Sequence, residues 1–199
     1  MSKIAFDAND QGTGVLTIAS PDTNNDRTLT LPDETGTVLT SAGGALGALK
    51  QADMYRITTD VTANGYITSN WERPDDPSFG YIGGGITESS GVFSFPQTGT
   101  YLIFAGVYAV AIGGDNVGFE TYVTLDNSSY DAVMHVVSAS GGSSTVANHA
   151  SGLCLVNVSN ISNTKVRFYA TSISSGSAIV GNTSQNQTHV AFIRLGDAS

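Results

Sequence analysis

Hydrophobic and polar residues alternate along much of this 199-residue chain with the two-residue period of β-strands. The clearest case is residues 91–110, GVFSFPQTGTYLIFAGVYAV, in which two apolar runs flank a turn. Pro96 and Gly99 predict that turn, because proline fixes φ and glycine accepts φ > 0 without steric cost. The second run, residues 101–105, is apolar at nearly every position. We expect its two faces to be covered, one by the chain's own core and the other by an identical subunit.

The same patterns divide the chain into three parts. Residues 1–40 are predicted to form a small β segment, with strands at 14–19, 27–31 and 37–40. Residues 41–52 are rich in Gly and Ala and are predicted to form a linker or a short helix. Residues 53–199 are predicted to form a head, which ends on a closing strand at residues 188–195.

Composition supports an all-β fold, since 40% hydrophobic, 13% charged residues and 23 glycines suit short strands and turns better than long amphipathic helices. The net charge of −9 argues against nucleic-acid binding, which needs clustered Lys and Arg. Neither a secretory signal peptide nor an apolar run of transmembrane length is visible in the sequence. We therefore expect a protein that is made in a cytoplasm and leaves it only as part of a larger particle.

The sequence offers little support for catalysis. Its three histidines lie in separate segments, and none belongs to a zinc-binding motif. Cys154, the single cysteine, has apolar neighbours, so we predict a small buried hydrophobic residue rather than a nucleophile. Aspartates at 75–76 and 126–131 are expected to stabilise turns, with calcium binding as the alternative. We expect no enzyme activity, no cofactor and no metal.

The pattern at residues 91–110 resembles the complement-type (C-one-q) globular head, a relative of the tumour necrosis factor jelly roll. That family has a G-x-F-x-x-P-x-x-G-x-Y-x-F core, which is matched here by Gly91, Phe93, Pro96, Gly99, Tyr101 and Ile103. Pro96 lies one place early, and Ala191 replaces the usual glycine of the closing strand. The resemblance covers roughly residues 51–196 and carries no collagen-like repeat, so the animal complement role is not implied.

This resemblance implies an antiparallel β-sandwich jelly roll that assembles as a trimer. The residues it suggests for the trimer interface or core are Tyr101, Ile103, Phe104 and Phe192.

A second resemblance lies in the N-terminal segment. Residues 27–40, RTLTLPDETGTVLT, are similar to a short unit found in tail-fibre and other surface proteins of tailed bacteriophages. Such a segment cannot bury much core alone, so we expect it to pair with neighbouring chains or to dock on a particle. The residues predicted to attach it to other virion proteins are Leu29, Leu31, Val38 and Leu39.

Together the two resemblances imply a non-enzymatic structural component of a tailed-bacteriophage virion. We predict a homotrimeric fibre, spike or surface knob that contacts a host glycan or surface protein, with no nucleic-acid partner and no membrane insertion. The alternative is a capsid decoration protein that stabilises the head, or an adaptor that joins virion parts. Loop aromatics are the candidates for partner contact, namely Trp71, Phe79, Tyr81 and Tyr130. For a tryptophan such as Trp71, core or interface packing is the commoner role and partner contact the alternative.

Overall fold

The structure is a computed structural model that describes residues 49–139, 142, 144–174 and 176–199, together with Asn24, Asp26 and Thr28. The predicted attachment segment therefore lies outside the described residues, apart from these three positions. The same holds for its four candidate attachment residues, Leu29, Leu31, Val38 and Leu39.

Strands are the only regular elements of the described residues, which contain no helix. In chain order they are β1 (Ala52–Ile57), β2 (Gly65–Tyr66), β3 (Trp71–Glu72), β4 (Thr87–Ser89), β5 (Val92–Ser94), β6 (Gly99–Ala111), β7 (Asn116–Thr124), β8 (Asp131–Ala139), β9 (Val146–Val158), β10 (Lys165–Thr171), β11 (Ala178–Ile179) and β12 (His189–Gly196). The predicted all-β fold is confirmed.

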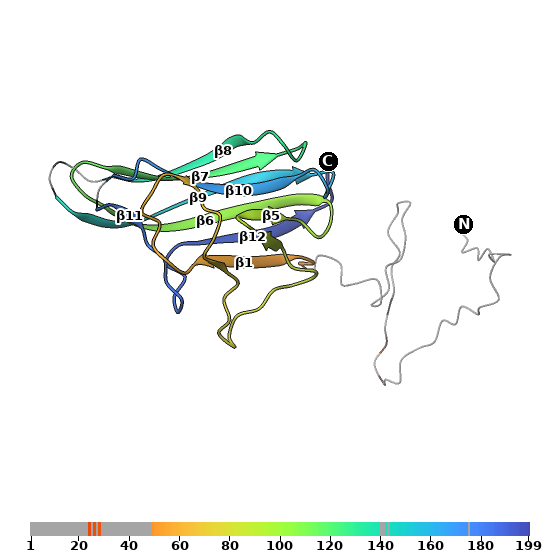
Figure 1. Cartoon of the computed structure of the whole chain (residues 1–199). Helices are drawn as coiled ribbons and strands as arrows, with labels where there is room; N and C mark the ends of the chain where they lie inside the picture. The colour runs from red at the N-terminus through yellow and green to blue at the C-terminus, as the bar shows by residue number, and fades with distance from the viewer. Residues whose placement is uncertain are drawn as a thin grey trace.

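The strands form two six-stranded antiparallel sheets, which pack against each other as a sandwich (Figure 1). In sheet A the long strand β6 pairs with β9 on one side and with β12 and β11 on the other, followed by β1 and β3. Sheet B has the order β4-β5-β10-β7-β8, and β2 also pairs with β10. The edge strands β8 and β9 contact each other, so they close one side of the sandwich.

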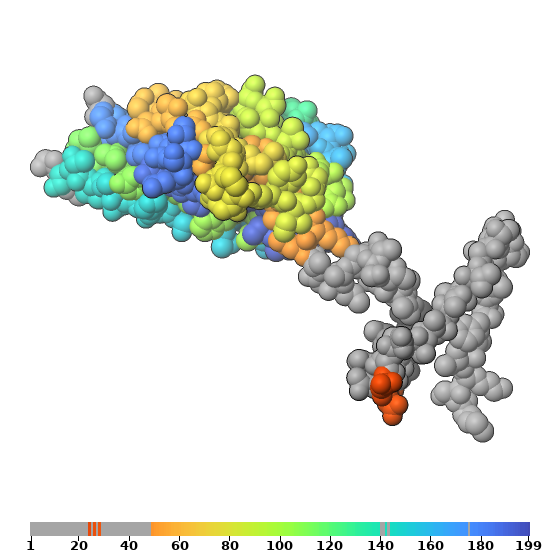
Figure 2. Space-filling view, turned by 90° about the horizontal axis from the view of Figure 1, so that it is seen from below, coloured from red at the N-terminus to blue at the C-terminus, as the bar shows by residue number. Residues whose placement is uncertain are grey.

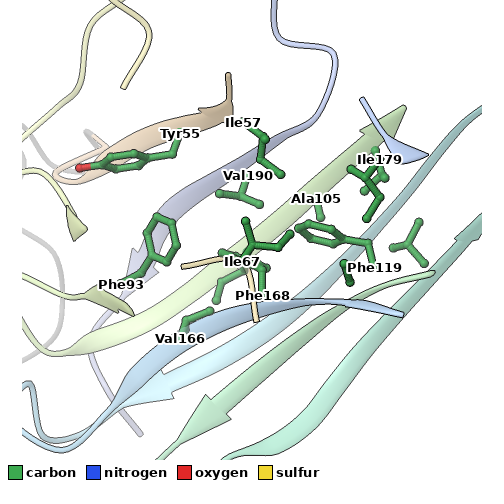
Figure 3. Packing of buried hydrophobic residues seen from close by; sticks show 14 of the residues in the cluster. Tyr55, Ile57, Ile67, Phe93, Ala105, Phe119, Val166, Phe168, Ile179 and Val190 are labelled. Atoms are coloured by element: carbon green, nitrogen blue, oxygen red, sulfur yellow. The ribbon is translucent and has the colours of Figure 1, made fainter. Parts of the chain in front are cut away.

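Side chains at alternate strand positions fill the space between the sheets. On β6, Tyr101 and Ile103 are fully buried, as the two-residue period requires. The ring of Phe168 lies at the centre of the aromatic packing, with ring centroids 5.2 Å from Phe93 and 5.3 Å from Phe119 (Figure 3). Contacts of this kind add to the stabilisation that comes from burial alone.

Two glycines of the 91–110 motif are required by the backbone. Gly91 has a φ of 76°, and a side chain there would collide with the carbonyl group of Ile67. Gly99 has a φ of 152°, and a Cβ atom there would strike the side chain of Arg194. The motif thus specifies close approaches between segments that are distant in the sequence.

The head begins inside the segment that was predicted to be a linker. Strand β1 starts at Ala52, which pairs with Ile193 of β12. Gln51 is fully buried, and its carbonyl group accepts a hydrogen bond from the Arg194 amide at 2.9 Å. The C-terminal end of residues 41–52 therefore belongs to the packed sandwich.

Candidate functional site

Three of the four residues suggested for the trimer interface or core lie inside the protomer. Tyr101, Ile103 and Phe192 are fully buried, and the Phe192 ring stacks on Phe93 with centroids 5.4 Å apart. Phe104 differs, because it lies on the other face of β6 and remains half-buried. Of these four residues, only Phe104 is therefore accessible for self-association.

Phe104 belongs to an apolar surface on the outward side of sheet A. Cross-strand register places it between Leu153 of β9 and Ala191 of β12. Two residues earlier on β6 the same arrangement recurs, and we call the whole set apolar face A, defined as Leu102, Phe104, Leu153, Leu155, Ala191 and Ile193. Leu153 and Leu155 are each 61% exposed. Monomeric soluble proteins rarely expose contiguous apolar surface of this kind without a binding role.

The apolar surface continues around the edge of the sandwich. A shallow hollow of about 230 Å³ lies where the end of β7, β8 and β9 come together. Leu155 lines it together with Leu125, which is 67% exposed, and Val133, which is 46% exposed. Leu155 belongs both to apolar face A and to this hollow, so within the described residues the exposed apolar surface extends from sheet A to the edge of the sandwich.

The outward side of sheet B has a different character, because four tyrosines gather there. Tyr66 of β2 lies at the centre, with ring centroids 5.1 Å from Tyr169 of β10 and 5.4 Å from Tyr122 of β7. Tyr130, in the loop before β8, lies 6.3 Å from Tyr66 between centroids. Of the four, only Tyr130 was predicted to contact a partner.

Arg167 of β10 completes this cluster. Its guanidinium carbon lies 3.8 Å from the ring centroid of Tyr66 and 5.5 Å from that of Tyr130. We call the set the tyrosine platform, defined as Tyr66, Tyr122, Tyr130, Tyr169 and Arg167. Burial raises the pKa of Tyr130, and donation to the Glu120 carboxylate at 3.0 Å raises that of Tyr122.

The loop that carries Tyr130 is shaped by Asp126. Its carboxylate accepts hydrogen bonds from the amides of Ser128 and Ser129, each at 2.8 Å, and from the Thr124 hydroxyl at 2.8 Å. These donors lower the pKa of Asp126. Asp126 thus stabilises a turn, as predicted for the aspartates of this segment.

The predicted partner-contact residues do not form one surface. Trp71 lies in β3, where its ring packs edge-to-face on Phe93 and its Nε1 donates to the Ile67 carbonyl at 2.9 Å, so it serves the core. Phe79 and Tyr81 lie in the loop between β3 and β4 and are 41% and 51% exposed. In the described residues neither contacts the tyrosine platform that contains Tyr130.

Arg73 ties the loop after β3 to strand β1. Its guanidinium donates to the Asp53 carboxylate at 2.9 and 2.8 Å, to the Tyr55 hydroxyl at 2.9 Å and to the Ile86 carbonyl at 2.8 Å. The Asp53 side chain is fully buried, and its hydrogen bonds raise the pKa of Arg73. This network holds in place the loop that displays Phe79 and Tyr81.

Another group of loops gathers at one side of the head, where residues of the 60s, the 70s and the 180s lie side by side in Figure 2. A hollow of about 250 Å³ opens within residues 60–70. Its single charged residue, Asp60, accepts a hydrogen bond from the Gly181 amide at 2.9 Å. The hollow therefore presents one carboxylate and a single aromatic ring, that of Tyr66.

Residue types used in catalysis form only loose pairs in the described part of the chain, such as His135 and Glu120, whose Nε2 and Oε1 atoms lie 3.9 Å apart. The histidines lie on three strands, β8, β9 and β12. Cys154 is half-buried against the core, and burial raises the pKa of its thiol. Asp75 pairs with Arg56 at 2.9 Å, and no three His, Cys, Asp or Glu side chains of the described residues are grouped so that they could hold a metal ion. Nor do these residues form a helix long and apolar enough to cross a membrane.

Comparison of the sequence with protein-family models and with curated proteins finds no match. Solved structures do match. The structure of Eiger TNF from S. frugiperda is 14% identical with a TM-score of 0.58, over 76% of this chain and 96% of that one. Murine APRIL is 10% identical with a TM-score of 0.55, over 73% of this chain and 98% of the other. These similarities confirm the predicted jelly-roll fold of the head.

Proposed function

We propose that this chain forms a homotrimer through apolar face A, and that the trimer is a non-enzymatic surface component of a tailed-bacteriophage virion. The observation that carries the proposal is the exposure of Leu153 and Leu155 beside Phe104 on a sheet that is already buried on its inner side. Burial of this face against identical subunits removes apolar area from water, which is the main favourable term in association. A closed threefold arrangement covers the face in every copy.

The oligomeric state tests the first half of the proposal. We expect the full chain to sediment as a trimer at micromolar concentration and Leu153→Asp to sediment as a monomer, because a carboxylate in a buried interface remains unpaired. Phe79→Asp is the matched control, since it adds the same charge at an exposed aromatic residue outside apolar face A. A monomeric wild type, or a trimeric Leu153→Asp variant, would contradict the proposal.

The assignment to a virion is supported by the resemblance of residues 27–40 to the phage surface-protein unit. We propose that residues 1–40 attach the head to the particle, and that the head is the tip of a fibre, a spike or a surface knob that meets the host. Antibody labelling of phage particles tests this location by electron microscopy. Label on the tail supports host attachment, label on the capsid supports the alternative role in decoration, and particles without label contradict both.

Deletion of residues 1–40 tests attachment separately. We expect the shortened chain to keep the sedimentation of a folded trimer and to be absent from purified particles, because the described strands and core of the sandwich all lie within residues 51–199. Incorporation of the shortened chain into particles would show that attachment lies in the head.

A further inference from the structure

We propose that the tyrosine platform on sheet B binds a carboxylate-bearing saccharide, with Arg167 pairing with the carboxylate and the tyrosine rings packing against the sugar. The inference rests on the proposed function in one respect, since it requires a head that faces the surroundings of the particle. It names the class of ligand that such a head recognises.

Arg167 is the one arginine of the described residues that has no carboxylate partner. The other arginines of the described residues, Arg56, Arg73 and Arg194, each pair with a carboxylate within 4.0 Å. Arg167 has no such pair there, and its buried Nε has no acceptor. Its two terminal nitrogens form no hydrogen bond within the described residues, and neither is among the fully buried unpaired polar atoms there. A guanidinium with both terminal nitrogens free matches the two oxygens of a carboxylate.

The platform also holds that guanidinium in place before any ligand arrives. Arg167 lies directly opposite Tyr122 in the sheet register and packs on the ring of Tyr66. Packing on rings restricts the side chain without neutralising its charge, so little conformational entropy remains to be lost on binding. This arrangement distinguishes Arg167 from an ordinary surface arginine that extends into water.

The tyrosines supply what the rest of a sugar requires. A tyrosine ring has an apolar face and a polar tip, and a sugar ring has an apolar C–H face surrounded by hydroxyl groups. The hydroxyls of Tyr66, Tyr130 and Tyr169 form no hydrogen bond within the described residues, so each keeps its capacity to donate and accept. Glu120, which accepts from Tyr122, adds a carboxylate that can accept from a sugar hydroxyl.

Charge limits the ligand to a sparsely charged one. Apart from Arg167, the outward positions of β10 offer one cation, Lys165, whose ammonium group already donates to the Ile161 carbonyl at 2.7 Å. A chain with a net charge of −9 repels a nucleic acid, which carries one phosphate per nucleotide. One carboxylate among neutral sugars fits Arg167, the one guanidinium of the described residues without a carboxylate partner.

Position in the fold favours the same conclusion. Apolar face A and the tyrosine platform lie on the outward sides of opposite sheets of one sandwich. Self-association through apolar face A leaves the tyrosine platform uncovered. The head thus has one face suited to identical copies and another suited to a polar ligand.

Binding of the full-length chain to immobilised oligosaccharides tests the inference. The probes are oligosaccharides that carry glucuronic, galacturonic or sialic acid, each beside its carboxyl-reduced counterpart. We expect at least one acidic probe to bind tenfold or more tightly than its reduced form, at about the strength of one charge-assisted hydrogen-bonded pair. Retention of no acidic probe above its reduced form would overturn the inference.

Variants assign the binding to the platform. We expect Arg167→Gln to weaken binding about tenfold or more, and Arg167→Lys to restore only part of it, because an ammonium group lacks the planar fork. Lys50→Gln, which removes the same charge at an exposed residue at the start of the head, is expected to bind like the wild type. Equal binding by Arg167→Gln and the wild type would refute the role of Arg167. Host-cell binding that is abolished by protease but survives periodate would instead identify a protein partner.

Failure of this inference and failure of the proposed function are separable. Arg167→Gln is expected to sediment like the wild type, since Arg167 lies outside apolar face A. If the chain is a trimer and antibodies find it on particles, but it binds no acidic saccharide, only the ligand assignment is wrong. If a monomeric chain binds the saccharide, only the proposed trimer is wrong. If the chain binds the saccharide but is absent from particles, only the proposed location is wrong.

Discussion

Replacement of Arg73 by leucine is expected to destabilise the head strongly, because it breaks a buried ion pair from one side. Asp53 has a fully buried side chain, and Arg73 supplies its only countercharge in the described residues. After the substitution the carboxylate keeps two donors, the amides of Ile86 at 2.6 Å and Met54 at 2.8 Å. A buried carboxylate with hydrogen bonds and no cation remains costly.

The magnitude follows from the geometry. Removal of one partner of a buried ion pair costs about 3–5 kcal/mol of unfolding free energy. The Arg73 side chain is 36% exposed, so water reaches the site and the lower end of that range, about 3 kcal/mol, is expected. The double variant Asp53→Asn/Arg73→Leu should lose less, because the asparagine oxygen still accepts from the Ile86 amide and no charge remains buried.

Urea unfolding of these variants at one fixed protomer concentration measures the effect, since oligomerisation makes apparent stability depend on concentration. Lys50→Leu is the control, because it removes a cation from an exposed position. A loss below 1 kcal/mol in Arg73→Leu would refute the reasoning that the pair is effectively buried. A double variant no more stable than Arg73→Leu would show that the lost contacts to Tyr55 and Ile86, and not the stranded charge, cause the loss.

Two further predictions concern single side chains. Tyr101→Ala should cost about 3–5 kcal/mol of unfolding free energy, because the ring is fully buried. Cys154→Ala should cost about 1 kcal/mol, because the thiol is only half-buried. Thermal melts that rank the two variants in the reverse order would contradict this packing. Burial lowers the pKa of His189, an effect that the carbonyl of Asn186 partly opposes and the charge of His149 reinforces. The unfolded chain therefore takes up this proton at a higher pH than the folded one, and stability should fall as the pH drops below about 6.5. Urea midpoints between pH 7.5 and 5 should fall less in His189→Gln, and an equal fall would exclude His189 as the cause.

The fold of the head could be predicted from the sequence because its clearest sequence motif, at residues 91–110, is formed by residues close together in the chain. The turn and flanking strands around Gly91 and Gly99 are specified by residues within about ten positions of each other. Assignment of faces was harder on β6, where Tyr101, Leu102, Ile103 and Phe104 are all apolar. Period-two alternation separates these residues into two sets but does not say which set faces the partner sheet.

The exposed surfaces were harder to predict, because they depend on register between distant strands. Leu153 and Leu155 were missed, although their alternation around Cys154 signals a strand with one outward apolar side. Tyr66 meets Tyr169 only through the pairing of β2 with β10, about one hundred residues later. Tyr130 was predictable as a contact residue because it lies in a loop. The sequence alone does not show that Arg167 and the strand tyrosines lie side by side, because their contacts depend on strand pairing.

Trp71 illustrates a choice that only the fold decides. The sequence allows both core packing and partner contact for this tryptophan, and residues 71–72 form strand β3 at the edge of sheet A. Edge strands expose one side of their backbone but still direct alternate side chains into the sandwich. The contact of the Trp71 ring with Phe93 and Phe168 follows from that direction.

The two proposals together predict that affinity for a polysaccharide depends on assembly while affinity for a short saccharide does not. In a threefold assembly through apolar face A, each subunit contributes one tyrosine platform, so a polymer with one carboxylate per repeating unit can engage several platforms at once. Linked binding events of this kind raise apparent affinity by about 100-fold or more without any new contact. Leu153→Asp should therefore lose most of its affinity for the polymer and retain that for a single repeating unit, because Leu153 lies outside the platform. Titration calorimetry with both ligands measures the difference. Equal loss for both ligands would mean that the substitution disturbs the platform itself, and no loss for the polymer would mean that the platforms do not act together.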